Sequence, residues 1–535
     1  MRPTVLIFVI ASAATVHSAE PIDIGSRREL FVDQYLVEKL DGARRVLHQP
    51  TPRGISLVRN KPWEGNATSK ETVFRDGDIY RMYYRGRQWL RTALDGHPTV
   101  TCYAESQDGI TWTKPELGLF EFNGSKKNNI VWAARETNDF SVFKDPNPDC
   151  PPEHLYKAVG RTYSPKYGKN TALFAFSSPD GIHWKLMREE PIASGGAFDS
   201  TNLAFWDAAR GVYRAYFRGH RGEVRHVRTV TSSDFVRWSK PVYLKLNSAA
   251  VDGRSNTAFK PDLTNQLYTN QIIPYYRAPH ILLGFPTRYV DYGWTESTRN
   301  LPGQKMRKRR QKLGGRRAAT AMTDGMFMSS RDGRTFQIWP ESFRRPGIQR
   351  PGSWTYGDNY QNWGLVETAS TLPGAPNELS MYVTEAYKSQ FAREPDSERG
   401  VYVSESDPDT PELVNRLRRY TIRIDGFVSV QAPLSGGTVL TRPLTFEGDQ
   451  LEINFSTSAA GGIRVEIQGL EGTPITGYGL DDCHPQYGDQ LDRIVTWKKM
   501  PSLEGLAGKP VRMLIELQDA DLYSFQFAIE NPTTK

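Results

Sequence analysis

Cysteine is scarce in this chain, and the short motifs of several common enzyme classes are missing. Its 535 residues include three cysteines, Cys102, Cys150 and Cys483, and none of them has a CxxC or metal-ligand spacing. Three thiols cannot all pair within one chain, so no disulfide framework is implied, and a bridge between Cys102 and Cys150 is the most that could form. No HExxH, P-loop or GxSxG pattern occurs. No sequence motif therefore supports a metalloprotease, nucleotide-binding or serine-hydrolase function.

Long apolar runs are missing beyond the first residues. The chain begins MRPTVLIFVIASAATVHSAE, with a basic Arg2, an apolar run over 5–14, and small residues at Ser18 and Ala19. The run is too short to span a bilayer, and small residues follow it, which predicts a signal peptide over 1–19. A buried N-terminal strand is the alternative. We expect a secreted or periplasmic protein without a membrane span.

Acidic residues are missing from the most basic stretch. The formal net charge is +8, and residues 305–317, KMRKRRQKLGGRR, carry eight positive charges and no negative one. The rest of the chain is therefore neutral, and the basicity belongs to one predicted loop. Such a run in an exported protein is typical of a solvated loop or of a contact to acidic glycan, so no nucleic-acid partner is expected.

Glycine, proline and aromatic residues are abundant, and they come in repeated strand–turn–strand units. Aromatic residues reach 11%, with 45 glycines and 35 prolines, which favours an all-β protein. The stretch 197–218, AFDSTNLAFWDAARGVYRAYFR, predicts a strand opening on Asp199, a turn at 207–211, and a second strand ending at Arg218. Similar units recur at 71–86, 139–163, 267–289 and 359–387.

Four of these units are followed by a similar turn. The turns read SQDGITW, SPDGIHW, SSDFVRW and SRDGRTF, and their aspartates are Asp108, Asp180, Asp234 and Asp332. We expect each aspartate to accept hydrogen bonds from local backbone amides, while Trp112, Trp184, Trp238 and Phe336 anchor an outer strand. Repetition of four-stranded units predicts a five-bladed β-propeller over 60–415.

Two further regions complete the predicted organisation. Residues 20–59 form an N-terminal segment that packs on the propeller. Residues 416–535 alternate strands with glycine-rich turns, lack the aspartate turns, and predict a C-terminal β-sandwich. This domain is either a carbohydrate-binding module or a packed structural partner.

The candidate site is predicted on one face of the propeller. On this face the first strand of each unit starts and the second strand ends. Aligning the units places Arg85, Arg161 and Arg218 there, which is costly unless carboxylates or an anionic ligand accompany them. The candidate catalytic carboxylates are Asp199, then Asp139 and Glu385 equally, then Glu64, although Asp139 and Glu385 could simply pair with ring arginines. Asp145 is interpreted as a residue of an opposite-face turn. The candidate substrate-binding residues are Arg85, Arg161, Arg218, Asn202, Gln271 and Asp358.

Paired carboxylates suit glycoside hydrolysis. One carboxylic acid protonates the leaving oxygen, and a second carboxylate activates water or attacks the sugar. The arginines would bind a uronate carboxylate or a sulfate group. The sequence therefore predicts an exported glycosidase acting on an acidic or sulfated polysaccharide or oligosaccharide, with no cofactor required and no metal among the site residues. Structural calcium is left open without being indicated. The alternatives are a non-catalytic glycan-binding propeller and a structural surface protein.

Several segments carry a family resemblance. They are IGSRRELFVDQYLVEKLDGA, YRMYYRG, FKDPNPDCPPEHLYKAVG, FDSTNLAFWD, LYTNQIIPYYRAPHILLGFPTRYV, GDNYQNWGLVET and LRRYTIRIDGFVSVQAPLSGG. Together they resemble secreted bacterial proteins described as similar to the glycoside hydrolase family 32 N-terminal domain. A looser resemblance extends to the five-bladed propellers of families 32, 43, 68 and 117. It implies acids on successive blades, which Asp139 and Asp199 match by position, and FKDP resembles the family 32 RDP motif at Asp145. No WMNDPNG-like segment or Glu-Cys motif is present, and the third-blade acid is Asp rather than Glu.

Overall fold

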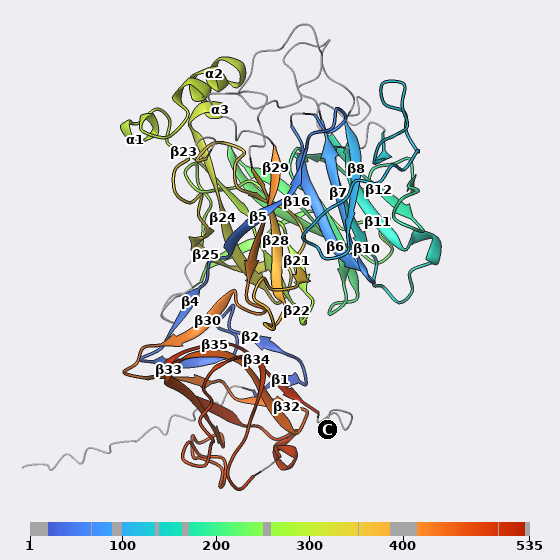
Figure 1. Ribbon diagram of the computed structural model, residues 1–535. Coiled ribbons are helices and arrows are strands. Elements are labelled where there is room, and N and C mark those ends of the chain that lie inside the picture. Colours follow the sequence, from blue (N-terminus) through green and yellow to red (C-terminus); the bar gives the residue numbers. More distant parts are fainter. Residues whose placement is uncertain are drawn as a thin grey trace, which may run out of the picture. The chain divides into compact units, whose positions relative to one another are not determined.

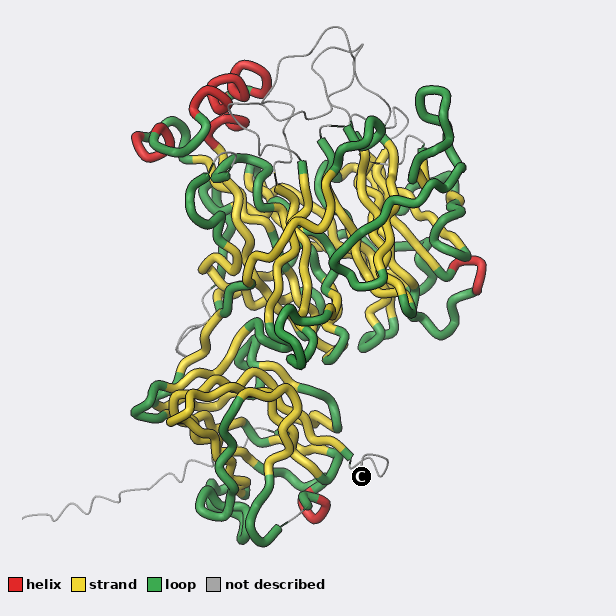
Figure 2. Tube along the Cα trace, in the orientation of Figure 1, coloured by secondary structure: helices red, strands yellow, loops and turns green. Residues whose placement is uncertain are grey.

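The structure is a computed structural model that describes residues 20–65, 67–87, 99–133, 138–162, 171–249, 258–350, 353–385, 415–500 and 502–529. The predicted signal peptide over 1–19 lies outside these residues. The described chain is mostly strand (Figures 1 and 2) and divides into two units. The large unit comprises residues 30–33 and 45–429, and the small unit holds the described residues before 30, those over 34–44, and those from 430 onward. No helix in the described part of the chain is long and apolar enough to cross a membrane.

The described strands of the large unit form five sheets. The first contains β6 (Ser69–Asp76), β7 (Ile79–Gly86), β8 (Val100–Ser106) and β9 (Ile130–Trp132). The second contains β10 (Asn138–Lys144), β11 (Tyr156–Thr162), β12 (Thr171–Ser178), β13 (Lys185–Leu186) and β14 (Ala193–Gly196). The third contains β15 (Leu203–Asp207), β16 (Val212–Arg221), β17 (Val224–Ser232) and β18 (Val242–Tyr243).

The other two sheets are less regular. The fourth contains β19 (Lys245–Ser248), β20 (Gln266–Leu267), β21 (Ile273–Tyr275), β22 (Ala278–Gly284), β23 (Thr287–Asp291), β24 (Ala321–Ser330) and β25 (Thr335–Arg344). The fifth contains β26 (Tyr360–Gln361), β27 (Val366–Thr368), β28 (Glu378–Glu385), β29 (Arg416–Ile422) and β5 (Thr51–Val58). Three helices connect β23 to β24 (Figure 1): α1 (Glu296–Arg299), α2 (Gln304–Gly314) and α3 (Arg316–Thr320).

The sheets follow one another in a propeller-like arrangement that closes on itself. The first sheet meets the fifth where Thr72 of β6 forms a parallel bridge with Trp363, just after β26. The Val73 amide donates to the Trp363 carbonyl at 2.8 Å, and the Trp363 amide donates to the Glu71 carbonyl at 3.0 Å. Strands packed between neighbouring sheets are buried on both faces, which explains why the middle of β12, ALFAF at 172–176, is apolar without alternation.

The chain boundaries of this arrangement differ from the predicted ones. The structure places β5, which the sequence assigned to the N-terminal segment over 20–59, at the outer edge of the fifth sheet, paired with β29. The strand β29 in turn pairs with β28, so the predicted boundary between 415 and 416 falls within this sheet. The large unit therefore extends to Ser429, because the last sheet is completed by strands from both ends of the unit.

The predicted hairpins are confirmed in three of the sheets. Asp76 pairs with Ile79, Lys144 pairs with Tyr156, and Asp207 pairs with Val212. One start point differs from the prediction, because β15 begins at Leu203 and Asp199 precedes it in a loop.

The predicted aspartate turns are confirmed in all four positions. Asp108, Asp180, Asp234 and Asp332 each bond a serine hydroxyl two residues earlier, and each accepts two backbone N–H groups, those two and three residues later. Burial raises the pKa of each of the four carboxyls, but the hydrogen bonds together outweigh burial and lower it. The aspartates therefore hold turns and are not part of a site.

Replacing Asp332 by alanine is expected to lower the free energy of unfolding by about 1–2 kcal/mol, because two backbone amides lose their acceptor. Urea denaturation would measure the change. Asp332→Asn is the matched control, since its side-chain oxygen can still accept both bonds, and it should cost less than half as much. Equal losses in the two variants would contradict this role.

The basic run at 305–317 is a structured segment, which corrects the prediction of a charged loop. It forms α2 and α3, and Arg307 and Arg310 are buried. Arg307 donates to the carbonyls of Ala319 and Trp354, and burial lowers the pKa of both arginines to about 10. These two side chains hold backbone in place, so they are unavailable for attracting a polyanion.

The small unit contains two sheets. β1 (Ile22–Gly25) pairs in parallel with β32 (Leu444–Phe446). The larger sheet includes β3 (Val37–Asp41), β31 (Gly437–Thr441), β33 (Gln450–Gln468), β34 (Asp489–Val495) and β35 (Arg512–Ala528). The boundaries between units fall at or within β2 (Glu29–Leu30), β4 (Arg44–Leu47) and β30 (Val428–Ala432). The thiols of Cys102, Cys150 and Cys483 are all free, so the bridge between Cys102 and Cys150 that the sequence left open is absent.

Candidate functional site

In four of the five sheets, a residue in the left-handed backbone region lies within two residues of the start of a strand, which is β6, β10, β21 or β26. These residues are Lys70 (φ 67°), Asp139 (φ 59°), Gln271 (φ 44°) and Asn359 (φ 67°). Non-glycine residues adopt this conformation at a cost of about 1–3 kcal/mol, and such residues cluster at functional sites. The shared conformation marks equivalent positions, and two of them, Asp139 and Asn359, are the first residues of units that the sequence indicated.

Asp139 lies in a cage of three cations drawn from the first two sheets. Its carboxylate is 2.6 Å from Lys70 Nζ, 2.8 Å from Arg85 Nη1 and 3.3 Å from Arg161 Nε. Only 1% of its side chain is exposed. The structure thus brings together Asp139 and two of the three predicted ring arginines, and it adds Lys70.

The charges of this cage fix the protonation state of Asp139. Burial raises the pKa of the carboxyl, but the positive charges of Lys70, Arg85 and Arg161 outweigh burial and bring the pKa to about 2. Burial also lowers the pKa of Lys70 well below its ordinary value. Asp139 is therefore an anion at any physiological pH, so it can stabilise charge, and it cannot donate a proton.

Asp199 is the exposed carboxylate of the candidate site. It contacts Arg218 Nη2, and 61% of its side chain is exposed, against 6% for Arg218. The loop that carries it is held by Asn202, whose amide nitrogen donates to the carbonyls of Phe198 and Ser200. Arg218 also experiences the charge of Asp139, so the exposed carboxylate and the buried cage lie within electrostatic range of the same arginine.

A tyrosine cluster supports the cations on the side of the fourth and fifth sheets. Tyr268 stacks on Tyr360 with ring centroids 5.6 Å apart. The Arg218 guanidinium lies 5.5 Å from the centre of the Tyr268 ring, and the Arg225 guanidinium lies 4.7 Å from that of Tyr289. Cation–π contacts of this kind hold arginines in place without neutralising them.

Amide groups without partners lie among these residues. Asn202 Oδ1, Gln271 Oε1, and both Oε1 and Nε2 of Gln361 are buried and have no hydrogen-bond partner among the described residues. Gln271 Nε2 does donate, to the Gln361 carbonyl at 2.9 Å. Buried polar atoms are ordinarily paired, so these atoms suit a ligand that offers both donors and acceptors.

Glu385 lies in a second arginine cluster in the fifth sheet, apart from the ring arginines predicted for it. It bonds Arg350, Arg416 and Arg418 at 2.9, 2.8 and 2.6 Å. Burial raises the pKa of its carboxyl, but Arg418 and Arg416 outweigh burial and lower it. Asp358, predicted to bind substrate, is buried and its charge acts on Arg418 as well as on Arg310 and Arg344.

Glu64 is placed away from these groups, within the first sheet and its loops. Its buried carboxylate accepts from the Tyr84 hydroxyl at 2.7 Å, lies 2.6 Å from Lys114 Nζ, and accepts from the Lys61 amide at 2.8 Å. These partners give Glu64 a role in holding the loop that precedes β6, and none of them belongs to the Asp139 cage.

The sequence reasoning missed Lys70, Gln361 and the tyrosine cluster as site residues. Lys70 could have been found, because VFRD at 73–76 repeats as VFKD at 142–145, and aligning these two segments places Lys70 opposite Asp139. Gln361 follows the fifth start by two residues and carried no separate signal. Among the described residues, no group of three or more His, Cys, Asp or Glu side chains is placed to hold a metal ion.

Comparisons with known proteins give likeness of fold only. No protein-family model matches this sequence, and no curated protein matches it. A solved structure described as a glycoside hydrolase is 13% identical, with a TM-score of 0.41 over 70% of this protein and 92% of that one. A glycosyl hydrolase from Bacteroides ovatus is 12% identical, with a TM-score of 0.39 over 71% and 94%. An N-acetylgalactosamine deacetylase from F. plautii is 11% identical, with a TM-score of 0.39 over 64% and 86%.

Proposed function

We propose that this chain is an exported glycoside hydrolase that acts on an acidic or sulfated saccharide. Its five sheets would be the five blades of a propeller, and the small unit would include the predicted β-sandwich. The observation that carries the proposal is a set of two unlike carboxylates whose charges both act on Arg218, Asp199 by direct contact and Asp139 from farther away. Asp139 is buried and permanently ionised, whereas Asp199 is exposed and open to a substrate.

The division of labour follows from the two environments. Glycoside hydrolysis needs one group that exchanges a proton with the glycosidic oxygen or with water, and one that stays ionised. Asp139 has the properties of the second group, as nucleophile or stabiliser of a positive transition state. Asp199 is the proton-exchanging carboxylate, because it is the exposed member of the pair. The unpartnered amides of Gln271 and Gln361 would bind sugar hydroxyls.

An anionic substrate is supported by the local excess of positive charge. Lys70, Arg85, Arg161, Arg218 and Arg225 are gathered around the two carboxylates Asp139 and Asp199. The Nε atoms of Arg218 and Arg225 have no hydrogen-bond partner among the described residues. A uronate carboxylate or a sulfate ester would supply the missing acceptors through charge-assisted hydrogen bonds.

A non-catalytic glycan-binding propeller is the second candidate. The observation that favours it is that Asp139 and Glu385 are each neutralised by three cations, as structural carboxylates are.

The test is incubation of the purified protein with anionic glycans and with neutral ones. Polygalacturonate, alginate, chondroitin sulfate and carrageenan would be compared with arabinan, levan and xylan, by reducing-end release and product mass. The expected result is release of fragments that have gained one water from at least one anionic glycan. Retardation of the protein by an anionic glycan in affinity electrophoresis, without release of any product, would favour the second candidate. Absence of both retardation and product release would contradict both candidates.

A further inference from the structure

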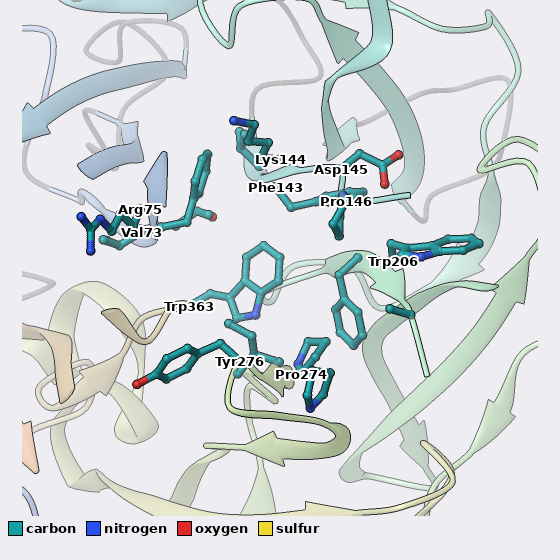
Figure 3. A pocket seen from close by; sticks show the side chains of 18 residues that line it. Val73, Arg75, Phe143, Lys144, Asp145, Pro146, Trp206, Pro274, Tyr276 and Trp363 are labelled. Atoms are coloured by element: carbon teal, nitrogen blue, oxygen red, sulfur yellow. The ribbon is translucent and has the colours of Figure 1, made fainter. Parts of the chain in front are cut away.

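A cavity lies toward the far ends of β6 and β10, the strands that carry Lys70 and Asp139 near their starts. It has a volume of 540 Å³ and is lined by residues of β6, β10, β15 and β21. Trp363, which follows β26 in the fifth sheet, also lines it (Figure 3). Lys70 and Asp139 lie near the starts of β6 and β10, whereas the cavity is lined by 72–75 and 142–145. All five sheets of the large unit therefore contribute to one chamber that is distinct from the polar site.

Ring edges and prolines dominate the walls of this cavity. Figure 3 shows Trp363 at its centre, with Trp206, Tyr276, Pro146 and Pro274 around the same space. Further lining residues of the same kind are Phe143, Phe205 and Pro279. A volume of roughly 300–1,000 Å³ with such walls is the usual size and character of a small-molecule site.

Three of the polar groups in these walls are already paired. The Trp363 indole N–H donates to the Ile272 carbonyl at 2.9 Å, and the Tyr276 hydroxyl donates to Glu367. The Asp145 carboxylate accepts from the Tyr213 hydroxyl at 2.6 Å and from Lys157. A saccharide would lose the hydration of several hydroxyls here and find few unpaired groups to replace it, so the walls favour an apolar ring instead.

Charged ligands are also disfavoured. Two exposed cations, Arg75 and Lys144, line the cavity, but each has a partner. Arg75 Nε donates to the Gly77 carbonyl at 3.0 Å, and Lys144 Nζ lies 2.6 Å from Asp76 Oδ1. An acidic ligand would have to compete with these bonds.

One lining hydroxyl has no partner. Thr72 is 2% exposed, and its Oγ1 forms no hydrogen bond with any described residue. A buried hydroxyl of this kind is costly unless a ligand or water meets it. A ligand with an apolar ring and one hydroxyl would satisfy both the walls and Thr72.

We propose that this cavity is a binding site for a small uncharged phenolic molecule, separate from the site at Asp139 and Asp199. The ring packs among Trp206, Trp363 and the prolines, and the phenolic hydroxyl bonds Thr72. Binding involves no covalent step and is independent of the proposed hydrolase activity.

The probe is 2-naphthol, titrated into the full-length protein by isothermal calorimetry at neutral pH, where it is uncharged. The expected dissociation constant is on the order of 0.1 mM for a ligand of this size. Ala208 lines the cavity from an exposed turn after β15, so Ala208→Trp should fill the space without removing a core contact. This variant should weaken binding at least about tenfold, whereas Ala208→Ser should bind as the native protein does. Circular dichroism would verify that both variants are folded.

A second substitution tests the hydrogen bond. Thr72→Val keeps the side-chain shape and removes the hydroxyl, and it should weaken 2-naphthol binding by roughly three- to tenfold. Asp199→Asn should leave binding unchanged, because Asp199 belongs to the other site. Absence of binding to the native protein at millimolar 2-naphthol would overturn the proposal. Undiminished binding to Ala208→Trp would overturn it too, since the probe would then occupy another place, such as the tyrosine cluster around Tyr268.

Discussion

Replacing Asp139 by asparagine is expected to destabilise the large unit by about 3–5 kcal/mol, one of the two largest effects that we predict. The reason is that the substitution leaves Lys70, Arg85 and Arg161 close together without their shared anion. Removing one partner of a buried ion cluster costs this much because the remaining charges stay desolvated and repel one another. Urea denaturation followed by tryptophan fluorescence would measure the change.

Asp199→Asn is the matched control, since it makes the same chemical change in the same arginine ring. Because 61% of the Asp199 side chain is exposed, its loss should cost less than about 1 kcal/mol. Similar losses of unfolding free energy in the two variants would show that the three cations around Asp139 make its carboxylate no more important for stability than the exposed carboxylate of Asp199.

The pH dependence gives an independent check on Asp139. Its pKa is about 2 in the folded protein, below the ordinary value of 3.8, so the folded state favours the ionised form. The stabilisation is therefore fully present above about pH 4 and is lost as the pH falls toward 2, in all about 2 kcal/mol. Between about pH 6 and about pH 3 the native protein should lose roughly 1 kcal/mol more than Asp139→Asn does.

Asp199→Asn is expected to lower kcat by about 10²- to 10⁴-fold on whichever anionic glycan the protein cleaves, with KM changed much less. The amide cannot exchange a proton with the glycosidic oxygen or with water, and general acid–base catalysis contributes about this much. Steady-state kinetics on the native protein and the variant would measure the effect. Glycan affinity, measured separately, should fall by less than about tenfold, because Arg218 remains in place.

Glu64→Gln provides the contrast for this experiment. The sequence ranked Glu64 among the catalytic carboxylates, but the structure places it against Tyr84, Lys114 and the Lys61 amide. Its substitution should reduce stability and leave kcat within about threefold, since it touches none of the proposed reacting groups. An Asp199→Asn variant that keeps more than about a tenth of the native kcat would remove Asp199 from the mechanism.

Local patterns in the sequence predicted the parts of the fold that local chemistry determines. The aspartate turns at 108, 180, 234 and 332 were predicted because a carboxylate two residues after serine satisfies nearby backbone amides in any context. The hairpins at 76–79 and 207–212 were predicted from alternation between apolar strands and polar turns. The same unit alignment placed Arg85, Arg161 and Asp139 at one end of neighbouring sheets, where the structure pairs them.

Burial of individual charged side chains could not be predicted in this way. The run at 305–317 appeared as uniform positive charge, yet Arg307 and Arg310 lie beneath backbone carbonyls, because helix α2 turns one side of the run inward. Glu64 and Glu385 have the same chemistry as Asp199 in the sequence. Only the three-dimensional arrangement shows that Lys114 covers the first and three arginines cover the second. The left-handed conformation of Lys70 likewise had no sequence signal, since lysine has no preference for it.

The pairing of β5 with β29 has a consequence for how the large unit folds. The fifth sheet is complete only when residues 51–58 pair with residues 416–422. These two strands are separated by almost the whole large unit, so the arrangement of sheets stays open until they pair. Long-range pairing of this kind slows folding, because most of the loop-closure entropy is lost before the contact is gained. During synthesis from the N-terminus, residues 51–58 remain unpaired while the four sheets that follow them in the sequence can assemble. A chain truncated before residue 416 would retain those sheets and present an open edge at β28, which makes it prone to aggregation.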